Sequence, residues 1–206
     1  MSVAVIKAFV GSGGKTTLLK KQAALYRQQG LRVFVTTTTH MLIEEDTLLT
    51  DDAQVIIRRL EETGYAIAGR PFGNKITPLS LETYQRVCGH ADVVLVEADG
   101  SKHMPIKFPN SKEPVIYENT DEIVVVCGLC ALGKRMCDVA HRLELVKECL
   151  GVSDHSIVTP EHIEKLVWDG YVSPLRKRYP LKIVRVLPTH DGSEEQMVIA
   201  ERLRRL

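Results

Sequence analysis

GSGGKTT, residues 11–17, lies between an apolar run and a segment with helical periodicity. The run VAVIKAFV at 3–10 predicts a buried strand, and TTLLKKQAALYRQQ at 16–29 predicts a helix that ends before Gly30. Glycines at such a junction let backbone N–H groups turn toward an anion, and the start of the helix adds partial positive charge. The stretch therefore predicts a strand–loop–helix unit that binds the phosphates of a nucleotide.

The loop is shorter than the common phosphate-binding pattern, which places four residues between its first glycine and Gly-Lys-Ser/Thr. That pattern needs glycine at position 9, where the chain has Phe9, whereas Gly-x-x-Gly-Lys-Thr fits from Gly11. In this arrangement Lys15 reaches the terminal phosphates and the Thr16 hydroxyl binds Mg²⁺. The alternative is a glycine-rich turn that binds nothing. The expected nucleotide-binding residues are Gly11, Ser12, Gly13, Gly14, Lys15, Thr16, Thr17 and Gly100.

Apolar runs and helical segments alternate along the rest of the chain. Further strands are expected at 31–39, 92–100, 122–129 and 181–187, with strand and turn at 65–79; helices are expected at 51–63, 81–89, 141–151, 160–168 and 193–206. Continuous apolar strands alternating with helices indicate a mostly parallel sheet with helices on both faces. We therefore predict an α/β fold like that of the P-loop NTPases, in a single domain over residues 1–206.

Two carboxylates follow the apolar run VVLV, at Glu97 and Asp99. Ligands bind at the carboxyl ends of strands in such sheets, so both are candidates for the nucleotide site. We expect Asp99 to hold Mg²⁺ with Thr16, because the adjacent Gly100 permits close approach to a terminal phosphate, and Glu97 to orient water or substrate. Lys15, Glu97 and Asp99 are thus the predicted catalytic residues. The alternative is a charged turn after a core strand.

Three further features carry weaker signals. TTTTH at 36–40 places hydroxyls at a strand end, where they either serve the site or simply favour the strand, and His40 fits a packed residue better than a base. Lys102 and Lys107, in the irregular segment 101–114, could close on a terminal phosphate. The five cysteines, including Cys127 and Cys130, fit reduced thiols better than zinc ligands.

Composition limits the function classes. Lys and Arg total 27 against 26 Asp and Glu, so the balance gives no sign of nucleic-acid or membrane binding. No apolar run is long enough to span a membrane, and no secretory signal is visible, so a cytoplasmic protein is expected. At 44% hydrophobic and 26% charged residues, the chain has the profile of a soluble globular protein.

The chain resembles the selenium-dependent molybdenum hydroxylase accessory proteins, the YqeC family. The resemblance covers nearly the whole chain, and its most specific segments are GSGGKTT, VTTTTHM, VEADGSKHMPIKFP, EPVI and GLCALGKRMCDVAHR. It implies a P-loop nucleoside triphosphatase fold and a role in maturing selenium-containing molybdenum hydroxylases. VEADG also looks like the strand end of metallochaperone GTPases, and the short loop is similar to that of Mur-type ligases.

These observations favour an enzyme that couples ATP or GTP turnover, with Mg²⁺, to cofactor or selenium delivery, with a molybdenum hydroxylase as possible partner. One alternative is a kinase or ligase-like enzyme that activates its substrate through phosphate. Another is a nucleotide-sensing scaffold that barely turns over. The base is left open: the guanine-reading Asn-Lys-x-Asp pattern is absent, although Asp191 follows the last strand.

Overall fold

The computed structural model describes residues 4–206 and divides them into two compact units, which are described one at a time. The first unit comprises residues up to Phe9, Thr16–Asp99 and Val115–Asp121; the second comprises Val10–Lys15, Gly100–Pro114 and Glu122–Leu206. Residue 3, where the first strand was expected to begin, lies outside the described residues. The expectation of a single domain stays a prediction.

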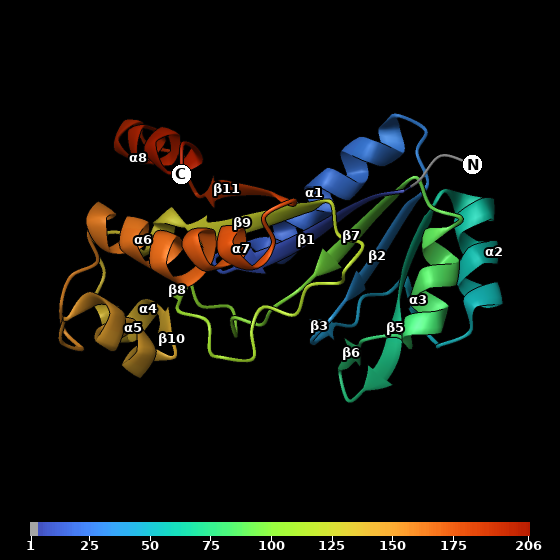
Figure 1. Ribbon diagram of the computed structural model, residues 1–206, viewed down its shortest axis with the longest axis horizontal. Coiled ribbons are helices and arrows are strands. Elements are labelled where there is room, and N and C mark those ends of the chain that lie inside the picture. Colours follow the sequence, from blue (N-terminus) through green and yellow to red (C-terminus); the bar gives the residue numbers. More distant parts are fainter. Residues whose placement is uncertain (1–3) are drawn as a thin grey trace. The chain divides into compact units, whose positions relative to one another are not determined.

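The first unit is built on a mostly parallel sheet (Figure 1). Its strand order is β1-β7-β2-β5-β6-β3, with β4 beside β5, and the pairings of β6 with β5 and β3 are antiparallel. The strands are β1 (Val5–Gly11), β2 (Val33–Thr37), β3 (Met41–Leu42), β4 (Thr47–Leu49), β5 (Tyr65–Phe72), β6 (Lys75–Thr77) and β7 (Val93–Glu97). The helices are α1 (Lys15–Gln28), α2 (Ala53–Thr63) and α3 (Leu81–Cys88).

One face of this sheet packs against α2 and α3. Phe34, Val94 and Val96 on the strands join Ile56 of α2 and Tyr84 of α3 in one buried cluster. Alternate strand residues such as Val33, Val35 and Leu95 point to the opposite face and are also buried. This burial on both faces explains why the strands are continuous apolar runs.

Local sequence signals set the ends of two helices. Asp52 caps the start of α2 by accepting a hydrogen bond from the Gln54 N–H, and Gly64 ends it in the left-handed conformation. In the second unit, Thr159 caps α6 (Pro160–Val167) in a capping box, with Pro160 in its first turn.

The second unit contains a parallel pair, β9 and β11, in register from Ile183 opposite Glu122 to Thr189 opposite Gly128. Its elements are β8 (Ile106–Lys107), β9 (Glu122–Gly128), the 3-10 turn η1 (Leu129–Ala131), α4 (Met136–Val139), β10 (Ala140–His141), α5 (Leu143–Leu150), α6 (Pro160–Val167), the π-helical turn η2 (Trp168–Val172), α7 (Ser173–Arg178), β11 (Ile183–Thr189) and α8 (Glu194–Arg204).

The mixed α/β fold with a mostly parallel sheet confirms the coarse prediction. The helix expected from His141 begins two residues later, at Leu143, because His141 belongs to β10 and Arg142 has a left-handed backbone. The two-residue strands β8 and β10, which pair in parallel, were not expected. Within residues 4–206 no helix is long and apolar enough to cross a membrane.

Candidate functional site

The glycine-rich turn, Gly11–Gly14, has a backbone that only glycine adopts easily. Gly11, Gly13 and Gly14 have φ angles of 91°, 77° and 118°. A Cβ on Gly13 would lie 2.4 Å from Gly128 Cα, and one on Gly11 would lie 2.1 Å from Val126 O. The three glycines are therefore required by conformation and, at Gly11 and Gly13, by close backbone packing.

Contacts within the second unit hold this turn in place. The Ser12 N–H donates to Val126 O at 2.9 Å, and the Ser12 hydroxyl donates to Pro105 O at 3.0 Å. The Thr189 hydroxyl at the end of β11 donates to Gly13 O. Ser12, predicted as a phosphate ligand, thus uses both its amide and its hydroxyl to anchor the turn.

Lys15 is the first residue of α1 and also belongs to the second unit. It is only 4% exposed, and its Nζ donates to Gly11 O at 2.7 Å and lies 3.4 Å from Ser101 Oγ. The side chain thus folds back over the glycine-rich turn. A carbonyl is a weaker partner for an ammonium than a phosphate oxygen, so an incoming phosphate could take its place.

Thr16 and Glu97 meet in the first unit. The β1–β7 register places Phe9 opposite Glu97, the last residue of β7. The Thr16 hydroxyl donates to Glu97 Oε2 at 2.8 Å, and Glu97 is 7% exposed. Two oxygens bound to Mg²⁺ at right angles, each at about 2.1 Å, lie about 3.0 Å apart. The 2.8 Å distance is the ordinary length of an O–H···O hydrogen bond, and it also brings the two oxygens close enough to bind one magnesium ion together.

The other predicted residues lie as follows. Asp99 is fully buried in the first unit, whereas Thr17 is exposed on α1. The Gly100 carbonyl accepts a hydrogen bond from Lys107 Nζ at 2.7 Å. The Thr16 hydroxyl, which was expected to bind a cation together with Asp99, donates a hydrogen bond to Glu97, and the shared cation stays a prediction.

The threonine run at the end of β2 is largely structural. The hydroxyls of Thr36, Thr37 and Thr38 donate to the backbone oxygens of Ala68, Glu97 and Val115, at 2.9, 2.8 and 2.7 Å. Among the described residues, the buried Thr39 Oγ1 atom has no hydrogen-bond partner. His40 is exposed, with its ring centroid 5.6 Å from that of Phe72, which fits a packed surface residue.

Lys107 does not occupy the place expected from the sequence. Its side chain is 0% exposed, and its Nζ lies 2.8 Å from Glu113 Oε2 as well as bonding to Gly100 O. Arg142 binds both oxygens of the same carboxylate. We call Lys107, Glu113 and Arg142 the ion cluster. Sequence reasoning missed Glu113 and Arg142, although both lie in segments that carry the family resemblance.

The ion cluster fixes the charge of its carboxyl group. Burial alone would raise the pKa of Glu113, but hydrogen bonds from Arg142 and Lys107, with their positive charges, outweigh it and lower the pKa to about 2. Burial and the neighbouring Arg142 and Lys107 charges lower the pKa of His141. Because its pKa is lowered, the Glu113 carboxylate stays ionised at neutral pH.

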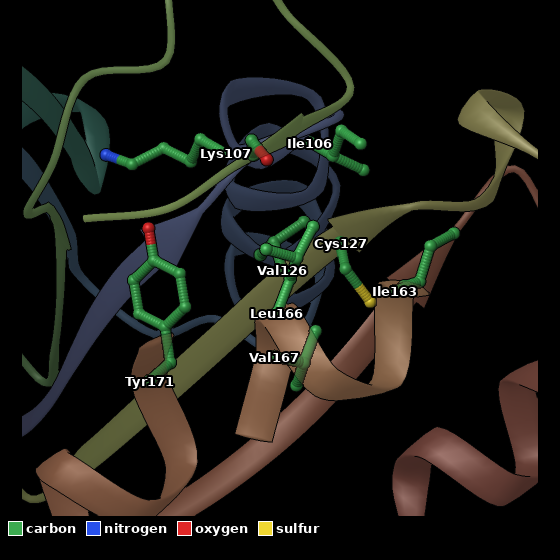
Figure 2. Close-up of a pocket in the computed structure, with 9 residues that line it drawn as sticks. Ile106, Lys107, Val126, Cys127, Ile163, Leu166, Val167 and Tyr171 are labelled. Carbon is green, nitrogen blue, oxygen red and sulfur yellow. The ribbon is translucent and has the colours of Figure 1, made fainter. Parts of the chain in front are cut away.

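A small pocket in the second unit is lined in part by Ser12 (Figure 2). Val126 and Cys127 of β9 and Ile163, Leu166 and Val167 of α6 line it, while the amino end of Lys107 points away from them. Its volume of about 10 Å³ holds about one water molecule. It is too small for a nucleotide base and belongs to the packing beneath the turn.

The cysteines are free thiols, and burial raises the pKa of Cys127 to about 12, which disfavours the thiolate that binds metals. No group of three or more His, Cys, Asp or Glu side chains within residues 4–206 is arranged to hold a metal ion. Asp191, the candidate reader of a base, is paired with Arg204 at 2.8 Å.

Comparison with known proteins places these features in a family. The family model described as YqeC protein matches residues 7–144, more than half of the chain. The chain is also similar to the uncharacterized protein YqeC of Escherichia coli (strain K12), with 31% identity over 171 residues. That alignment covers 77% of this chain and 65% of the relative, so the chain spans a little under two thirds of that protein's length. The matched region contains the glycine-rich turn, Glu97 and the ion cluster, and the chain belongs to the YqeC family.

Proposed function

We propose that this protein is a P-loop nucleoside triphosphatase that binds ATP or GTP with Mg²⁺. The observation that carries the proposal is the hydrogen bond from Thr16, which follows Lys15 in the chain, to Glu97 at the end of β7. A glycine-rich turn, a lysine and a hydroxyl in this order at a strand-to-helix junction, with a carboxylate at the end of another strand, are the parts that phosphoryl transfer requires.

The chain's residues divide this work by their chemistry. The amides of Gly13 and Gly14 and the start of α1 supply partial positive charge for phosphate oxygens. Lys15 exchanges the Gly11 carbonyl for a terminal phosphate and stabilises charge on the transferred group. Magnesium, when bound, would neutralise the developing charge on the phosphates.

We assign the magnesium ion to Thr16 and Glu97 rather than to Thr16 and Asp99. The sequence favoured Asp99 because Gly100 follows it, but the hydroxyl of Thr16 lies 2.8 Å from the Glu97 carboxylate. We therefore give Glu97 the place near the cation, and Asp99, buried two residues further on, the role of orienting water or substrate. This assignment exchanges the two roles that the sequence suggested.

The wider role rests on the family resemblance. We propose that nucleotide turnover supports the maturation of selenium-dependent molybdenum hydroxylases, with the hydroxylase as partner. The absence of Asn-Lys-x-Asp and the pairing of Asp191 with Arg204 give no preference for guanine, so both nucleotides belong in the first experiments.

The test compares Glu97→Gln with Asp99→Asn. For the wild type, Mg²⁺ should strengthen binding of a nonhydrolysable triphosphate at least about tenfold, corresponding to about 1.4 kcal/mol. Glu97→Gln should lose this gain, whereas Asp99→Asn should keep it and lower turnover. Titration calorimetry with and without Mg²⁺, and phosphate release, measure the two effects.

A matched control is Asp92→Asn, at the opposite end of β7, where Asp92 pairs with Arg32. It should leave both quantities unchanged. If Asp99→Asn alone removed the magnesium gain, the original assignment of Asp99 to the cation would be correct. Tight binding without phosphate release in the wild type would favour the scaffold alternative.

A further inference from the structure

The ion cluster is hydrogen-bonded to the carbonyl of Gly100, which directly follows Asp99 in the chain. Lys107 Nζ donates to the Gly100 carbonyl at 2.7 Å and lies 2.8 Å from Glu113 Oε2. Arg142 holds the same carboxylate, with its Nη2 donating to Oε1 at 2.9 Å. Because Lys107 has a fully buried side chain, its ammonium needs these partners. The position of the Gly100 carbonyl is thus linked to charged residues as far along the chain as Arg142.

The backbone around the cluster is equally constrained. Ile106 and Lys107 form β8, which pairs in parallel with Ala140 and His141 of β10. Arg142 follows directly with φ 61° and ψ 57°, a left-handed conformation that is uncommon outside glycine. Strand pairing and ion pairing together hold the two sides of the cluster.

Holding the Gly100 carbonyl also orients Ser101. In a planar trans peptide the C=O and the following N–H point in opposite directions, so the bond from Lys107 to Gly100 O turns the Ser101 N–H away from Lys107. The Ser101 hydroxyl lies 3.4 Å from Lys15 Nζ, and Ser101 is half-buried. Ser101 therefore lies beside the amino group that the proposed function assigns to the terminal phosphate.

We infer that Ser101 is a further ligand for the terminal phosphate and that the ion cluster positions it. This inference rests on the proposed function and deepens it, because it adds a contact that a triphosphate makes and a diphosphate does not. Lys107, Glu113 and Arg142 act through the Gly100–Ser101 peptide and are positioning residues. The cluster thereby sets the preference for triphosphate over diphosphate.

The first readout needs no nucleotide. Amide hydrogen exchange in peptides covering residues 98–104 should rise at least about tenfold in Lys107→Met, because the bond that fixes the Gly100–Ser101 peptide is lost. Lys112→Met is the matched control, since Lys112 is an exposed lysine of the same loop, and it should exchange like the wild type. Unchanged exchange in Lys107→Met would overturn the positioning role.

The second readout is nucleotide preference. With Mg²⁺, Lys107→Met should weaken binding of nonhydrolysable ATP or GTP analogues about tenfold and change binding of ADP or GDP less than about twofold. Ser101→Ala should reduce the same preference about threefold while leaving exchange near the wild-type rate. Equal losses for triphosphate and diphosphate would show a merely structural cluster and overturn the inference.

Two further results distinguish a failure of this inference from a failure of the proposed function. If Lys107→Met does not fold, Glu113→Gln replaces it, since the amide oxygen can still accept one hydrogen bond, and it should shift both readouts in the same direction. If the wild type binds neither class of nucleotide, the proposed function and the role of Ser101 both fail. The exchange experiment would then still decide whether the cluster holds the Gly100–Ser101 peptide.

Discussion

Glu97 and Glu113 are both largely buried glutamates, but their partners differ. In the first unit Glu97 accepts a hydrogen bond from the neutral hydroxyl of Thr16. In the second unit Glu113 is shared by the cations Lys107 and Arg142. Charge pairing holds Glu113 in the ion cluster, whereas the proposed function assigns the Thr16–Glu97 pair to a magnesium ion.

The difference should appear in the free energy of unfolding, where we expect the largest effect. Glu113→Gln should lower it by about 3 kcal/mol, because the variant leaves a fully buried ammonium and a guanidinium without their anion. Glu97→Gln should lower it by less than about 1 kcal/mol, since the amide oxygen still accepts the Thr16 bond. Urea unfolding at neutral pH measures both; equal losses would contradict the contrast.

The charge pairing of Glu113 should also appear, as a smaller effect, in the dependence of the free energy of unfolding on pH. Glu113 has an ordinary pKa of 4.5 and a folded-state pKa of about 2, so it adds stability that is present above pH 4.5 and lost as pH falls toward 2. Between pH 6 and pH 3, this one group should account for about 2 kcal/mol of the loss. Urea unfolding across this range should therefore give Glu113→Gln a shallower pH dependence than the wild type; parallel curves would show that the group is not charge-paired.

Much of the fold could be predicted from short-range signals. Gly64 and the Thr159-Pro160 pair mark helix ends within a few residues, and the buried strands are continuous apolar runs. The pairing of β8 with β10 and the π-helical turn at Trp168–Val172 have no such signal, because two residues carry no periodicity and the turn continues a helical segment.

The candidate site was predictable to the same extent. The position of Glu97 after an apolar strand indicated it as a candidate, and the glycine-rich stretch indicated Lys15 and Thr16. Which carboxylate contacts Thr16 depends on the position of side chains 81 residues apart in the chain, so the sequence, which favoured Asp99 for the cation, could not show the contact with Glu97. The ion pair between Glu113 and Arg142 spans 29 residues and involves a left-handed arginine, neither of which a single sequence reveals.

The central claim is the proposal that Lys15, which follows the glycine-rich turn in the chain, binds the phosphates of a nucleoside triphosphate in the presence of Mg²⁺. The most direct measurement is a calorimetric titration of the wild type and Lys15→Ala with ATP and GTP in the presence of Mg²⁺, with far-UV circular dichroism to check the fold. The wild type should bind at least one triphosphate, and Lys15→Ala should bind it about 10- to 100-fold more weakly, as expected for a lost charge-assisted bond. A wild type that binds neither triphosphate, or a folded Lys15→Ala with unchanged affinity, would contradict the claim.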